Sequence, residues 1–85
     1  MTRAEEIETR LRAAFAPREL IVENQSNRHA GHSGDDGTGE SHFAVRIRAT
    51  GFAGQNRLAR HRAVHKALGP DLVGEIHALA LDIDA

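Results

Sequence analysis

The strongest constraint on the fold is a predicted strand–helix–strand segment in the second half of the chain. Apolar residues alternate along residues 42–48, which is the pattern of a half-buried strand. Residues 55–68 are predicted to form a helix that ends at Gly69 and the proline after it, and residues 76–83 return as a strand. A strand–helix–strand unit forms a right-handed crossover between parallel strands. We therefore expect residues 42–48 to form the central strand of a sheet.

The first half of the chain predicts a helix and a strand that completes this sheet. Thr2 and Glu5 have the spacing of a capping box, and the apolar positions over residues 3–15 recur at helical spacing until Pro17 ends the helix. Residues 19–24 are β-prone and should pair with the central strand as an antiparallel hairpin. Residues 71–74 add at most one helical turn.

The predicted fold is therefore of the α/β class, in a single domain over residues 1–85. Its element order is α-β-β-α-(α)-β, with a three-stranded mixed sheet and the helices on one face.

Composition excludes several classes of function. The chain has 85 residues, a net charge of −1 and no cysteine, so it can form neither disulfides nor thiolate metal sites. Its overall charge does not indicate nucleic-acid binding, and no serine stands in the context of a nucleophile, so we expect a protein that is not an enzyme. The acidic residues near its start do not fit a targeting segment, and we expect a cytoplasmic protein with no membrane association.

The histidines are the residues with chemical potential. His61 lies in the middle of an apolar arc of the second helix, which predicts a core histidine bonded to a backbone carbonyl, and His65 should be partly exposed. His42, at the first residue of the central strand, is expected to form a local hydrogen bond. His77 opens the last strand at the rim of the sheet, where a structural role and a ligand role are equally compatible with the pattern.

Two further histidines lie in the polar run between the first two predicted strands. This run, residues 24–41, is rich in Gly, Asp and Ser, and we expect an exposed, mobile loop. His29 and His32 have an H-x-x-H spacing that could hold a metal, although this short pattern is frequent by chance.

The second helix also has a basic surface, which is compatible with phosphate contacts but is more often only solvated. No acid occurs over residues 55–67, and the cations are Arg57, Arg60, Arg62 and Lys66. The tetrapeptide 51–54 has a G-x-x-G pattern, but it follows a strand, whereas the KH-domain clamp lies between helices, so we interpret it as coincidence.

Four motifs, taken together, resemble the BolA family over nearly the whole chain. They are SHF at residues 41–43, FAG at 52–54, RHR at 60–62 and IHALAL at 76–81. The resemblance implies a fold similar to class II KH domains. BolA-like proteins are partners of monothiol glutaredoxins, with which they form heterodimers that bridge a 2Fe-2S cluster, and they are linked to iron regulation and cluster delivery.

The resemblance also implies which residues would be ligands. His77 matches the histidine that binds the cluster, and a second ligand comes from the loop between the first two strands, where His29 is favoured and His32 is the alternative. A glutaredoxin cysteine and a bound glutathione would complete the site, because two imidazoles alone hold such a cluster poorly. The isolated chain is expected to be a monomer or a weak homodimer. Some BolA proteins are described as transcriptional regulators, so DNA binding through the second helix is the alternative function.

Overall fold

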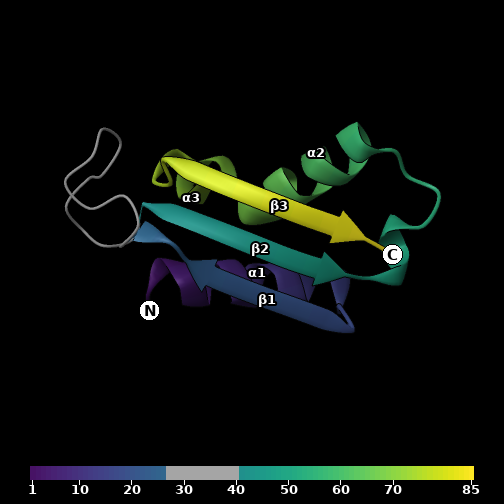
Figure 1. Ribbon diagram of the computed structural model, residues 1–85, viewed down its shortest axis with the longest axis horizontal. Coiled ribbons are helices and arrows are strands. Elements are labelled where there is room, and N and C mark those ends of the chain that lie inside the picture. Colours follow the sequence, from purple (N-terminus) through teal and green to yellow (C-terminus); the bar gives the residue numbers. More distant parts are fainter. Residues whose placement is uncertain (27–40) are drawn as a thin grey trace.

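A computed structural model of the chain describes residues 1–26 and 41–85, and its elements follow the predicted order. They are α1 (Arg3–Phe15), β1 (Glu19–Asn24), β2 (His42–Arg48), the 3₁₀ turn η2 (Thr50–Phe52), α2 (Arg57–Leu68), α3 (Pro70–Gly74) and β3 (Ala78–Asp84). Figure 1 shows α1, α2 and α3 on one side of the sheet, so that no helix of the described residues covers its other face.

The sheet has the predicted topology, with β2 between β1 and β3. β1 pairs with β2 antiparallel, so that Val22 lies opposite Val45, and β2 pairs with β3 parallel, so that Val45 also lies opposite Leu81. The α/β fold with a three-stranded mixed sheet is therefore confirmed. The comparison with KH domains stays a prediction.

Helix α1 begins and ends for the reasons that its sequence indicates. Thr2 Oγ1 accepts a hydrogen bond from the Glu5 backbone N–H at 3.1 Å, and Glu5 Oε1 accepts one from the Thr2 N–H at 3.2 Å, which completes the capping box. After Phe15 the backbone of Ala16 turns left-handed, with φ at 45°, and Pro17 follows. Ile7 and Leu11 face the core and are fully buried.

The core lies between the helices and the sheet and includes a residue from the G-x-x-G tetrapeptide. Phe52 in η2 is fully buried, and its ring centroid lies 4.7 Å from that of Phe15. The tetrapeptide thus forms a turn that places an aromatic ring in the core. The other buried apolar residues are Ile7, Leu11, Phe43, Val45, Ile47, Ala49, Val64, Leu68 and Leu72.

The predicted boundaries of α2 and β3 are wrong by one or two residues. Helix α2 begins at Arg57 and not at residue 55, because the Asn56 side chain accepts a hydrogen bond from the Ala59 N–H at 2.8 Å and caps the helix. Strand β3 covers Ala78–Asp84 and not residues 76–83, so His77 precedes the strand and does not open it.

The short helix α3 confirms the helical turn expected over residues 71–74 and begins one residue earlier, because proline fits the first position of a helix. Gly69 makes the sharp connection between α2 and α3. Its φ is 86°, and a Cβ there would lie 2.8 Å from Asp71 Oδ1, so this position requires glycine.

The predicted mobile loop, with His29 and His32, lies outside the described residues except at its two ends. There Asn24 completes β1 and Ser41 immediately precedes β2. Among the described residues, no helix has the length and apolar character needed to cross a membrane.

Candidate functional site

His77 lies at the end of the sheet where β2 and β3 begin. Its side chain is exposed, while its backbone N–H donates to the Ser41 carbonyl at 2.9 Å. The same carbonyl accepts the Ala78 N–H at 3.2 Å. The imidazole of His77 is therefore open to solvent on a backbone that is fixed to the neighbouring strand.

His42 lies next to His77 but is buried, with 5% of its surface exposed. A hydrogen bond of 2.7 Å joins Ser41 Oγ and His42 Nδ1, which confirms the predicted local bond. The ring centroids of His42 and His77 are 5.2 Å apart, at an interplanar angle of 49°. The fixed ring of His42 therefore forms one wall beside the exposed ring of His77.

The side chain of Ser26 links the two ends of the loop by hydrogen bonds. Its Oγ accepts hydrogen bonds from the N–H of Ser41 at 2.9 Å and from that of His42 at 3.1 Å, and Ser26 itself is buried. The Gln25 N–H donates to the His42 carbonyl at 2.8 Å. These bonds hold the ends of the loop beside His77.

We expect Ser26→Ala to lower the free energy of unfolding by about 1–3 kcal/mol, because it leaves buried N–H groups of Ser41 and His42 without their acceptor. Urea denaturation followed by circular dichroism measures the change. Ser26→Thr keeps the hydroxyl and should retain most of the stability. If Ser26→Ala is as stable as the wild type, the hydroxyl does not hold the loop ends.

Of the predicted ligands, the structure describes only His77. His29 and His32 lie outside the described residues, and among the described ones no three His, Cys, Asp or Glu side chains come together in a way that could hold a metal. Among the described residues, this end of the sheet offers one accessible imidazole, which in its neutral form is a good ligand for iron and other transition metals.

Sequence reasoning missed Ser26 and the contact between His42 and His77. Ser26 is one of several serines in a polar run, and nothing in the sequence separates it from the others. The contact follows from the parallel register, which pairs His42 with Ala78, but the predicted start of β3 was two residues too early to give that register.

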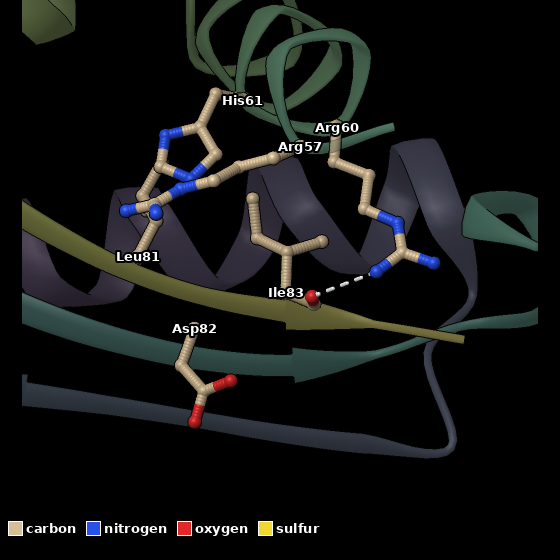
Figure 2. Close-up of a pocket in the computed structure, with 6 residues that line it drawn as sticks. All are labelled: Arg57, Arg60, His61, Leu81, Asp82 and Ile83. Carbon is tan, nitrogen blue, oxygen red and sulfur yellow. Dashed lines mark hydrogen bonds between the residues drawn. The ribbon is translucent and has the colours of Figure 1, made fainter. Parts of the chain in front are cut away.

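The prediction for His61 is wrong. Its ring is only half-buried, no hydrogen bond joins it to any described residue, and it lines an open hollow between α2 and β3 (Figure 2). The predicted apolar arc included Leu58, which is 57% exposed; the buried residues of α2 are Val64 and Leu68. His65, expected to be partly exposed, is exposed.

Arg60 does not belong to the exposed basic surface of α2. Its Nε donates to the Phe52 carbonyl at 3.2 Å, and its Nη1 donates to the Ile83 carbonyl at 3.3 Å and pairs with Asp84 at 3.3 Å. The Ala85 N–H and then the charge of Arg60 lower the pKa of Asp84. Arg60 thus links the end of β3 to η2. The other cations of the predicted basic surface are exposed: Arg57, Arg62 and Lys66.

Comparison with known proteins identifies relatives over most of the chain. Residues 11–85 match the family model described as BolA-like protein. A Sinorhizobium protein described as an uncharacterized protein in the cobS 5′ region is 51% identical over 83 residues, which cover 96% of this chain and 89% of that protein. The DNA-binding transcriptional regulator BolA of Escherichia coli is 43% identical over 77 residues, covering 91% of this chain and 70% of the regulator.

Solved structures agree with these sequence matches. The structure of BolA1 from Arabidopsis thaliana has a TM-score of 0.84 and 37% sequence identity, and the match covers 99% of this chain and 92% of that structure. An Arabidopsis thaliana protein described as BOLA1, chloroplastic, is 40% identical over 81 residues, which cover 93% of this chain but only 51% of that protein's length.

Proposed function

The chain belongs to the family of BolA-like proteins, and from this premise we propose that it is a non-enzymatic partner of a monothiol glutaredoxin that supplies histidine ligands to a shared 2Fe-2S cluster. In this proposal the pair acts in iron–sulfur cluster trafficking or iron regulation. The E. coli relative is named as a regulator and the Arabidopsis relative simply as BolA1, and neither of these names describes an enzyme.

The observation that carries the proposal is the position of His77. Its imidazole is exposed, its backbone is fixed to Ser41, and it lies beside the ends of the loop that holds His29 and His32. Imidazole is an established ligand of 2Fe-2S iron in Rieske centres, so the donor chemistry fits the cluster. When bound, such a cluster supplies a one-electron redox centre whose potential is higher with imidazole than with four thiolates.

A partner must contribute the remaining ligands. A 2Fe-2S cluster needs four, and the chain has no cysteine, so the thiolates would come from the cysteine of the glutaredoxin and from glutathione. The burial of His42 supports the assignment of His77 as the ligand, because of these two neighbouring rings only that of His77 is exposed.

The experiment that tests the proposal is reconstitution of the cluster. The purified chain is mixed with a monothiol glutaredoxin, glutathione, iron and sulfide, and the visible absorption and circular dichroism spectra are compared with those of glutaredoxin alone. A changed spectrum with a heterodimer on gel filtration is the expected result. The spectrum of glutaredoxin alone, with the chain eluting separately, would contradict the proposal.

Variants in the loop distinguish its two candidate ligands. If His29 is the ligand, we expect His29→Ala to destabilise the cluster and His32→Ala to change little, because only the first removes a bond to iron. The rate of cluster loss, followed by visible absorption, measures the difference. If the two residues are interchangeable, each single variant retains a cluster and only the double variant loses it. Retention by the double variant would remove the loop from the ligand set.

DNA binding is a second candidate function because the E. coli relative is named a DNA-binding transcriptional regulator. Arg57, Arg62 and Lys66 are exposed on α2 and could contact phosphates, whereas Arg60 is occupied by its bonds within the chain. Binding of duplex DNA by the isolated chain that weakens steeply with salt would support this function. No binding at low salt would exclude it.

A further inference from the structure

A hollow of about 280 Å³ lies between α2 and β3, away from the histidines at the loop end of the sheet. Arg57, Arg60 and His61 of α2 form one side, and the side chains of Leu81 and Ile83 face them from β3 (Figure 2). Leu81, the first lining residue of β3 along the chain, is four residues past His77, about 13 Å along an extended strand, so the hollow is separate from His77. The inference drawn from it does not depend on the proposed function.

The α2 side of the hollow carries positive charge from its two arginines, and the two carboxylates beside the hollow, Asp82 and Asp84, are both paired with arginines. Asp82 is part of the lining, but Figure 2 shows its carboxylate on the opposite side of β3, where it pairs with Arg46 at 3.4 Å and Arg48 at 3.0 Å. Arg60 is neutralised by Asp84. Arg57 has no acidic partner among the described residues, and it lines the hollow together with His61.

We propose that this hollow binds the phosphate group of a small phosphorylated molecule. Arg57 and His61 contact the phosphate oxygens, and the apolar side chains of Leu81 and Ile83 contact the rest of the molecule. The size of the hollow is near the lower end of the range for ligand pockets, which suits a nucleoside monophosphate or a molecule of similar size.

The arrangement of donors favours phosphate over carboxylate. The guanidinium of Arg57 alone can satisfy both oxygens of a carboxylate through two parallel N–H bonds. An imidazole has at least one N–H donor in either protonation state. The imidazole of His61, one helical turn after Arg57 on α2, can therefore donate a hydrogen bond to the ligand from a second direction. A tetrahedral phosphate has a third oxygen to accept that bond. Two residues of the RHR motif thus have different roles: Arg60 bonds to the end of β3, and His61 lines the hollow.

The test is a titration of the purified full-length chain with inorganic phosphate in low-salt buffer, followed by amide and imidazole chemical shifts. We expect saturable shifts at Arg57, His61, Leu81 and Ile83. Arg57→Gln should weaken binding about tenfold or more, because it removes a charge-assisted pair. Arg62→Gln is the matched control, since it removes an equal charge from the same helix outside the hollow, and it should change the affinity by less than about twofold.

Two further titrations test which class of ligand the hollow binds. His61→Phe keeps an aromatic ring but has no N–H donor, and it should weaken phosphate binding while acetate binding stays as weak as in the wild type. Adenosine monophosphate should bind more tightly than inorganic phosphate if a small molecule is the natural source of the phosphate. The amide spectrum of each variant checks its fold. Equal losses in Arg57→Gln and Arg62→Gln, acetate binding as tight as phosphate, or no saturable shifts would overturn the proposal.

Discussion

We expect the substitution of His77 by alanine to abolish or strongly weaken the 2Fe-2S cluster that we propose this chain shares with a monothiol glutaredoxin, and to leave the fold intact. The side chain of His77 is exposed, so its removal costs little packing, and the bonds that fix this segment to Ser41 come from the backbone and survive the substitution. One lost iron ligand should leave a cluster that decays rapidly or does not form. Visible circular dichroism of the reconstituted mixture measures the cluster, and far-ultraviolet circular dichroism measures the fold.

His65→Ala is the matched control for this variant. His65 is also exposed, but it lies on α2 and takes no part in the site at the loop end of the sheet, so the cluster spectrum should match that of the wild type. An unfolded His77→Ala protein, or one with an unchanged cluster spectrum, would show that His77 is not the ligand. Binding of the glutaredoxin without a cluster is compatible with the assignment.

The second large effect is on stability. Phe52→Ala removes a fully buried ring that packs on Phe15 at a centroid distance of 4.7 Å, and it should lower the free energy of unfolding by about 3–5 kcal/mol. That loss is a large fraction of the stability of a domain of this size. Urea denaturation of the wild type and the variant gives the difference.

Phe52→Leu is the control that keeps an apolar side chain in place, and it should cost less than half as much. A substitution at Gly51 tests the G-x-x-G tetrapeptide in another way, because a turn whose role is to place Phe52 in the core does not need a glycine at this exposed position. Gly51, where a Cβ would meet nothing within 4 Å, should accept alanine at little cost. A stable Phe52→Ala protein would contradict the structural role of this turn.

The sheet could be predicted because chain connectivity and local signals agree. The hairpin of β1 with β2 and the crossover from β2 to β3 together place β2 in the centre, and the capping box of Thr2 and Glu5 marks the start of α1. The boundaries of α2 and β3 could not be predicted as well. Asn56 could have been either a cap or the second residue of a helix that begins at residue 55. Ile76 is β-prone in sequence, although β3 begins only at Ala78.

Only part of the candidate site could be predicted from the sequence. His77 was singled out by its place after a turn and by the family resemblance, while Ser26 and His42 gain their roles from the register of strands that are distant in sequence. The error on His61 has a different cause. A helical wheel gives the apolar arc of α2 but not how the helix is rotated against the sheet, and the bonds of Arg60 to Phe52 and Ile83 leave Leu58 and His61 near the surface.

The central claim, that a histidine of this chain binds iron, is tested most directly by pulsed electron paramagnetic resonance of the reduced heteromeric cluster. The chain is labelled with ¹⁵N-histidine, whereas the glutaredoxin and glutathione carry natural nitrogen. We expect strong ¹⁵N hyperfine couplings typical of imidazole bound to iron, with the coupling assigned to His77 missing from any cluster that His77→Ala retains. A reduced cluster in the labelled heterodimer with no strong ¹⁵N coupling would contradict this claim.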